Sequence, residues 1–293
     1  MRWLVTGAAG QLGFRLMNAL AGQDAVGVTH ADLDITSAEA VDEVIASHRP
    51  DVVLNAAGYT AVDAAETDEA GALAVNRDGP ANLARALARQ RGSLVQISTD
   101  YVFAGDADRP YDVDDPTGPR TAYGRSKLAG ELMVRELLPD RSTIVRSAWM
   151  YGGPGANFVD NIVRCERERD TLKVVADQAG SPTYVSDLAN ALVALGHRGR
   201  SYELLHYVNA GCASWFELAR ETFRLLDADP DRVRPTTTDR FPRPASRPAW
   251  SVLSTRSWVE AGLPAPREWR LALAEHLAGL TAAHAAVTES GGD

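Results

Sequence analysis

The stretch RWLVTGAAGQLG (residues 2–13) determines the fold class. A run of strand-forming residues leads directly into a loop with glycines at positions 7, 10 and 13. The first glycine of such a loop permits a tight turn, the second lets the backbone approach a pyrophosphate, and the third allows a helix to pack closely on the strand. A phosphate then binds the free amides where that helix begins. We therefore predict a dinucleotide-binding loop formed by Gly7, Gly10, Gln11, Leu12 and Gly13.

The alternation of strand and helix continues through the first half of the chain. Short runs rich in β-branched residues occur at 25–29, 51–56, 93–98 and 142–146. Stretches rich in Ala and Leu lie between them and are expected to be helices, at 11–22, 37–48, 66–90 and 121–138. This alternation indicates parallel strands with crossover helices, and continuously apolar strands indicate burial on both faces. The sequence therefore predicts an α/β protein with a Rossmann-type doubly wound parallel sheet.

The regular alternation ends after about residue 150. Short strands are expected at 172–176 and 205–209, and helices at 156–169, 186–196 and 214–227. We predict a dinucleotide-binding domain at 1–150, a smaller mixed C-terminal substrate-binding domain at 151–280, and a disordered tail at 281–293. Residues 176–200 are expected to return to the first domain. The Pro-rich segment 235–248 is either an inert linker or an ordered lid over a ligand.

The composition excludes several classes of partner. The chain of 293 residues has a net charge of −9, which disfavours binding to a nucleic-acid backbone. Cys165 and Cys212 lack a metal-ligand spacing and form no disulfide framework, so we expect no metal site and a reducing compartment. The N-terminus lacks the features of a signal peptide, and no stretch reaches the roughly 20 apolar residues of a membrane span. These features predict a soluble cytoplasmic enzyme.

The residue that closes the second strand usually distinguishes NAD from NADP. An acid at this position binds the ribose hydroxyls, whereas a basic residue accepts the 2′-phosphate. The segment VTHAD (28–32) places His30 near that position, with Asp32 close behind, and neither residue is decisive. For a reductive role we expect NADPH as the cofactor, with NADH also accepted.

The stretch TAYGRSKLAGE (121–131) places Tyr123 one helical turn before Lys127. Residues four apart lie on the same face of a helix. The reference pKa of tyrosine is near 10, and a nearby ammonium lowers it, so such a pair can give a proton to a carbonyl oxygen. Taken alone, the pair also fits a solvated helix face. The context favours catalysis, because strand 93–98 delivers Ser98 and Thr99 at its carboxyl end, where open α/β sheets bind ligands.

The sequence resembles the extended short-chain dehydrogenase/reductases, and within them the dTDP-4-dehydrorhamnose reductase family. The spacing GxxGxxG is the form found in short-chain dehydrogenase/reductases, and the resemblance extends from residue 1 to about 280. The matching stretches are GAAGQLG (7–13), DLDIT (32–36), PDVVLNAAGYTAVDAAE (50–66), AVNRDGPANLA (74–84), STDYVFAG (98–105), TAYGRSKLAGE (121–131), RSAWMYG (146–152), NFV (157–159), DQAGSPTYVSDLA (177–189), SWFELA (214–219) and RPAWSVLST (247–255).

The resemblance implies a role for individual residues. Thr99 would polarise the C4 carbonyl of a sugar, Tyr123 would donate the proton, and Lys127 would hold the nicotinamide ribose and lower the pKa of Tyr123. The cofactor-binding set would also include His30, Asp34, Ile35, Ala56, Ala57 and Gly58. The substrate-binding set would be Asp100, Tyr101, Trp149, Asn157 and Arg247. A core indole remains the alternative for Trp149, and loop decoration the alternative for Arg247.

The implied reaction is NAD(P)H-dependent reduction of the C4 keto group of a dTDP-4-keto-6-deoxyhexose. Reduction of a different deoxysugar in secondary metabolism uses the same residues. A 4,6-dehydratase is disfavoured, because Tyr101 stands where dehydratases carry Glu after Thr-Asp. An epimerase and a non-catalytic dinucleotide-binding subunit are the remaining alternatives. Some family members form a metal-linked dimer through a Glu, but this chain has Arg15 there, so we expect a monomer or a different homodimer.

Overall fold

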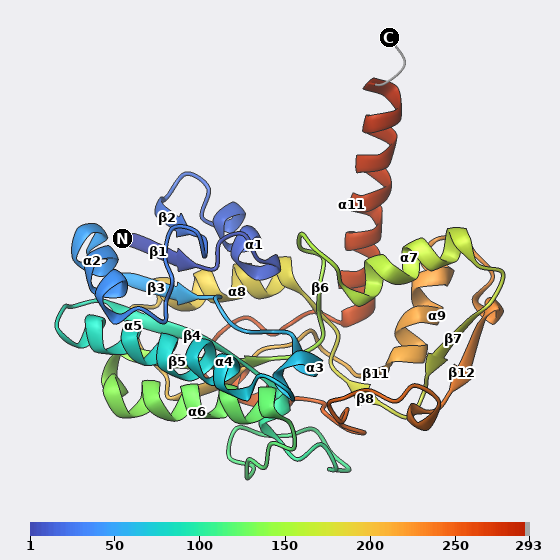
Figure 1. The fold of residues 1–293 in the computed structure, drawn as a ribbon. Helices are drawn as coiled ribbons and strands as arrows, with labels where there is room; N and C mark the ends of the chain where they lie inside the picture. The colour runs from blue at the N-terminus through green and yellow to red at the C-terminus, as the bar shows by residue number, and fades with distance from the viewer. Residues whose placement is uncertain (291–293) are drawn as a thin grey trace.

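We analysed a computed structural model that describes the backbone of residues 1–290 and the side chains of residues 1–281. Its main feature is a six-stranded sheet with helices on both faces (Figure 1). Along the part of the chain that is described, no helix is both long and apolar enough to cross a membrane.

All strands of the main sheet are parallel, in the order β10-β5-β4-β3-β1-β2. This order reverses direction between β1 and β3, which is the point where open α/β sheets form a crevice for ligands. The predicted Rossmann-type sheet is therefore confirmed. The strands are β1 (Arg2–Thr6), β2 (Asp24–Val28), β3 (Val52–Asn55), β4 (Ser93–Thr99), β5 (Ser142–Ser147) and β10 (Leu204–His206).

Two hydrophobic cores lie on opposite faces of this sheet. Trp3 and Val5 of β1 pack with α1 and α8, whereas Leu4 between them packs with α2 and α5. Successive side chains of a strand point to opposite faces, which explains why the whole strand is apolar. The covering helices are α1 (Gln11–Ala19), α8 (Val185–His197), α2 (Ala38–His48), α5 (Gly79–Ala88), α6 (Ala122–Leu137) and α10 (Arg256–Glu260).

The helix expected at 66–90 is present as one continuous helical run over residues 69–88, preceded by the short helix α3 (Val62–Ala65). Within it, α4 (Glu69–Leu73) and α5 are joined by a π-helical turn (Ala74–Asp78) that the sequence did not predict. Asn76 explains the irregular turn, because its buried side chain bonds both backbone groups of Tyr59 and the hydroxyl of Ser126 instead of facing solvent. This turn therefore links the loop after β3 to helix α6.

The second half forms a smaller group of elements beside the main sheet (Figure 1). Helices α7 (Phe158–Glu168) and α9 (Trp215–Leu225) pack on the parallel pair β7 (Leu172–Val175) and β12 (Val233–Thr236). The remaining short strands are β6 (Met150–Tyr151), β8 (Ala179–Gly180), β9 (Thr183–Tyr184) and β11 (Ala213–Ser214). Strand β10 joins the main sheet, so the return of the chain to that sheet extends beyond the expected 176–200. The division into two domains remains a prediction.

The last helix, α11 (Trp269–Ser290), packs into the second half of the chain through Trp269, Leu273 and Leu277, and beyond these residues it projects away from the rest of the molecule (Figure 1). The tail expected from residue 281 is therefore helical as far as Ser290, which agrees with its content of alanine, the strongest helix former. Residues 291–293 of the expected tail lie outside the described residues.

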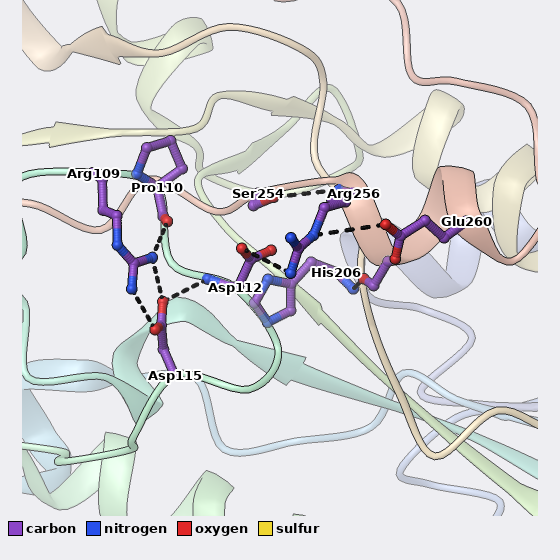
Figure 2. A network of polar contacts seen from close by, with 9 residues as sticks. Arg109, Pro110, Asp112, Asp115, His206, Ser254, Arg256 and Glu260 are labelled. Carbon is purple, nitrogen blue, oxygen red and sulfur yellow. Dashed lines mark hydrogen bonds and ion pairs between the residues drawn. The ribbon is translucent and has the colours of Figure 1, made fainter.

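A polar network ties the loop after β4 to the start of α10 (Figure 2). Asp115 accepts two hydrogen bonds from Arg109, at 2.8 and 2.7 Å, and one from the amide of Asp112. The Arg256 guanidinium lies 3.2 Å from Asp112. His206 lies beside this network, fully buried, and burial lowers the pKa of its imidazole to about 3.

Candidate active site

The glycine loop has the geometry of a phosphate cradle. Gly7 has a φ of 69°, and a Cβ there would lie 2.7 Å from the amide nitrogen of Ala57, at the crevice between β1 and β3. A Cβ on Gly13 would overlap the carbonyl oxygen of Gly7. Helix α1 begins at Gln11 without a side-chain cap, so its first amides remain available for an anion. These features fit the pyrophosphate of a dinucleotide.

The residues predicted to bind the adenosine part of the dinucleotide do not all have side chains that a ligand can reach. His30 and Asp34 are exposed, and Asp34 accepts hydrogen bonds from the amide and hydroxyl of Thr36, which lower the pKa of its carboxyl. Ile35, in contrast, is buried against Gly79, and Leu12 is buried beneath the sheet. These two side chains are closed to a cofactor, so a contact from either residue would come from its backbone; that both residues bind the cofactor stays a prediction.

Helix α6 carries the predicted proton donor and its partner. Thr121 begins the helix by accepting a hydrogen bond from the amide of Gly124, and Glu66 accepts the amide of Ala122. The half-buried Tyr123 and the buried Lys127 follow on the face toward β4. The Lys127 ammonium donates to the carbonyl oxygen of Ile97 at 2.6 Å. The helix thus brings both side chains to the carboxyl end of β4.

Of the two hydroxyls that end β4, only that of Thr99 faces the Tyr123 side chain. Thr99 interacts with the Tyr123 hydroxyl and donates to Asp100 at 2.9 Å. The hydroxyl of Ser98 donates instead to Glu131, two helical turns beyond Tyr123 on α6. Thr99 is therefore the second hydroxyl beside Tyr123.

The expectation that Lys127 lowers the pKa of Tyr123 is not met. Burial raises the pKa of Tyr123 to about 12, and its hydrogen bond with Thr99 offsets this only in part. Lys127 instead bonds the β4 backbone, and burial lowers the pKa of its ammonium to about 8. Tyr123 is therefore protonated at neutral pH, as a proton donor must be.

The carboxyl of Asp100 is buried beside this pair. Burial raises its pKa to about 6, because the charged form is poorly solvated there. The neighbouring Tyr101 ring packs edge-on against the Tyr123 ring, with 5.5 Å between centroids. Tyr101 also lines a cavity of about 740 Å³, which lies between α7, β7 and the segment 238–248 and is large enough for a nucleotide sugar.

Trp149 forms the wall of this cavity with a residue that the sequence analysis did not identify. The Trp149 and Trp215 rings stack at 3.5 Å between centroids and 3° between planes. Trp149 has a φ of 45°, which a bulky residue rarely adopts and which is typical of functional sites. A Cβ at Gly180 would overlap the indole, so glycine is required beneath it. The Trp215 indole nitrogen donates to Gln178 at 3.1 Å.

Arg247 lines the cavity and is paired with Asp63. Its guanidinium donates two hydrogen bonds of 2.9 Å to the carboxylate of Asp63, which also accepts the amide of Ala245. The segment 235–248 is therefore an ordered cover rather than a free linker. Asn157, in contrast, begins α7 by accepting the amide of Asp160, and it is not among the residues that line the cavity. This placement gives Asn157 a structural role at the start of α7, and its contact with a diphosphate stays a prediction.

Sequence analysis did not identify Asp63, Gln178 and Trp215, which line the cavity, or Glu131, which accepts the hydrogen bond of Ser98. All four lie within stretches that carried the family resemblance, at 50–66, 214–219, 177–189 and 121–131. Asp63, Gln178 and Trp215 meet their partners only through the fold, whereas Glu131 follows Lys127 by four residues, a spacing that could have identified it.

Comparison with known proteins identifies the family. The chain matches the RmlD substrate binding domain family over residues 1–282. It is 51% identical over 282 residues to a dTDP-4-dehydrorhamnose reductase of Streptomyces griseus, with 94% of this chain and 92% of that protein covered. The chain belongs to the dTDP-4-dehydrorhamnose reductase family. The predicted resemblance to this reductase family is thereby confirmed.

One further relative and one solved structure are also similar to this chain over most of its length. A probable dTDP-4,6-dihydroxy-2-methyloxan-3-one 4-ketoreductase of Streptomyces antibioticus is 49% identical over 294 residues, covering 99% of both chains. The solved structure of the Bacillus anthracis dTDP-4-dehydrorhamnose reductase in complex with NADP has a TM-score of 0.91 at 37% identity, covering 95% of this chain and 99% of that one. Among the side chains described here, no group of His, Cys, Asp or Glu is arranged to hold a metal ion.

Proposed function

We propose that this chain reduces the C4 keto group of a dTDP-4-keto-6-deoxyhexose, with NADPH as the cofactor and NADH also accepted. It is an NAD(P)H-dependent oxidoreductase of the dTDP-4-dehydrorhamnose reductase family. The observation that carries the proposal is the meeting of Thr99, Tyr123 and Lys127 at the carboxyl end of β4, between the glycine loop and the cavity walled by Trp149.

The proposed reaction needs a proton at the carbonyl oxygen as well as a hydride at C4. NADPH, when bound, supplies the hydride. Tyr123 holds its proton at neutral pH and donates it to the oxygen. The Thr99 hydroxyl, which donates to Asp100 in the structure, would turn its one hydrogen to the same substrate oxygen. The Lys127 ammonium, whose donors are not all used by the carbonyl oxygen of Ile97, holds the nicotinamide ribose.

The remaining predicted residues have supporting roles. The glycine loop with Ala56, Ala57 and Gly58 would hold the dinucleotide, and a Cβ on Gly58 would lie 3.9 Å from the Lys127 ammonium. Asp100, Tyr101 and Trp149 would contact the hexose. Arg247 would contact the diphosphate of the dTDP group.

Substitution of Tyr123 by Phe tests the proposal. The Tyr123→Phe variant keeps the ring but has no proton to donate, so kcat should fall by at least about 100-fold. NADPH affinity, measured by fluorescence, should change by less than about twofold in the same variant. Near-full turnover of a dTDP-4-keto-6-deoxyhexose by Tyr123→Phe would exclude Tyr123 as the proton donor.

A ketoreductase for a deoxysugar of secondary metabolism is the second candidate. It is favoured by the 49% identity to the Streptomyces antibioticus protein over nearly the full length of both chains. Incubation with a panel of dTDP-4-keto-hexoses, followed by NMR of the C4 configuration, distinguishes the two.

A cytoplasmic location remains a prediction. A monomer, or a homodimer without a magnesium bridge, also remains a prediction; in its support, Arg15 donates to the carbonyl oxygen of Gly152 at 2.8 Å within its own chain.

A further inference from the structure

Glu131 is buried one helical turn beyond Lys127, on the same face of α6. Tyr123, Lys127 and Glu131 thus follow each other at intervals of four residues. The Glu131 carboxylate accepts hydrogen bonds from Arg146 at 2.9 and 2.6 Å and a further one from Ser98. It therefore ties the catalytic helix to the ends of β4 and β5.

We propose that Glu131 is a positioning residue whose negative charge keeps the buried Lys127 ammonium protonated and in place for the cofactor ribose. This inference rests on the proposed role of Lys127. Burial alone would favour the neutral amine, and the Glu131 carboxylate is the charge that opposes this effect. With the pKa of Lys127 at about 8, loss of this charge would leave much of the lysine neutral at physiological pH.

The other groups around Lys127 do not replace Glu131. Tyr123 is neutral at physiological pH. Tyr59, which follows Gly58 on the loop after β3, carries a phenol and not a carboxylate. Asp100, at the end of β4, lies beside Tyr123 and not beside Lys127. Arg146 on β5 is positive and is held by Glu131 itself. Glu131 is thus the carboxylate that acts on the charge of Lys127.

The composition permits a direct measurement, because Lys127 and Lys173 are the only lysines in the chain. Protein labelled with lysine carrying ¹³C at Cε gives two side-chain signals, and the cofactor-free protein can be titrated by NMR. Lys173 lies exposed on β7 and provides the internal reference.

In Glu131→Gln, which retains the acceptor for Ser98 but not the charge, the titration midpoint of Lys127 should fall by about one pH unit. Glu131→Asp should restore it, and Glu136→Gln, an exposed residue of the same helix, should leave it unchanged. Because Glu131→Gln leaves Arg146 buried without its partner, the double variant E131Q/R146M removes both charges, and the downward shift should persist.

The same shift should appear in cofactor binding and in turnover. In Glu131→Gln, NADPH affinity should begin to fall at a pH lower by the same amount as the Lys127 midpoint. The pH at which kcat/KM falls on the alkaline side should shift equally where the sugar is turned over. An unchanged Lys127 midpoint in folded Glu131→Gln and E131Q/R146M would overturn the proposal and leave Glu131 a purely structural residue. Absence of sugar turnover in the wild-type protein, with the NMR shift intact, would instead contradict only the proposed substrate.

Discussion

Replacing Arg247 by Ala separates two roles of this side chain. In the structure, the guanidinium both lines the cavity and is fixed by two hydrogen bonds of 2.9 Å to Asp63. Its side chain is 22% exposed and that of Asp63 is 32% exposed, so the pair is only partly screened by solvent. A half-buried bidentate pair of this kind contributes about 1 kcal/mol to the stability of the folded protein, which is the upper end of the range for exposed ion pairs.

A contact between Arg247 and the diphosphate would contribute more than this pair. Hydrogen bonds to charged groups are worth about 1.5–3 kcal/mol, so Arg247→Ala should raise KM for the dTDP-sugar by about 10- to 100-fold. Asp63→Ala only removes the support of Arg247 and should raise KM by about fivefold. NADPH affinity should be unchanged in both variants, because neither residue lies at the glycine loop.

Steady-state kinetics of the two single variants and of D63A/R247A form a double-mutant cycle. If Arg247 binds the diphosphate with support from Asp63, the double variant should resemble Arg247→Ala alone. Arg247→Lys keeps the charge but loses the paired donors, so its KM should lie between those of the wild type and Arg247→Ala. A KM for Arg247→Ala within about twofold of the wild-type value would refute the assignment of Arg247 to the substrate.

Three further predictions follow from single positions. Gly13→Ala should weaken NADPH binding by at least about tenfold, because its Cβ would overlap the Gly7 oxygen, whereas Gly279→Ala, with open space around it, should not. Trp215→Ala should raise KM for the sugar by about three- to tenfold through loss of the stack on Trp149, with kcat little changed. Acid denaturation tests His206: its pKa of about 3 lies below the unfolded value, so stability is lost as pH falls below about 6.5. Between pH 6.5 and 5 this loss is roughly 2 kcal/mol, and His206→Phe should lack it.

The sequence predicted those parts of the fold that depend on local pattern. The glycine spacing placed Gly7 and Gly13 correctly, since each position requires the absence of a Cβ. The tyrosine–lysine spacing placed both side chains on one face of α6, because helix geometry alone determines this. The π-helical turn within the helix expected at 66–90 was not predicted, because it depends on Asn76 binding groups on two other elements, which no local propensity records.

The substrate side of the site was less predictable because it is built from distant pairs. Asp63 and Arg247 are 184 residues apart, and Trp149 meets Trp215 only after the second half folds against β6. Asn157 looked like a polar ligand in sequence, but a helix start satisfies the same side chain. Polar residues in loops can therefore be assigned to a substrate only when their other partners are known.

The preference for arginine over lysine along the chain explains why the charge of Lys127 can be adjusted by its surroundings. The thirty basic residues include only two lysines, and among the side chains that the structure describes the ion pairs to carboxylates are formed by arginine, with His276 the one histidine. A guanidinium remains charged when buried, whereas burial readily lowers the pKa of an ammonium. Glu131 pairs with the fixed charge of Arg146, and under the proposal above it also controls the variable charge of Lys127, one helical turn before it. The charge of Lys127 therefore depends on a residue that never contacts the substrate.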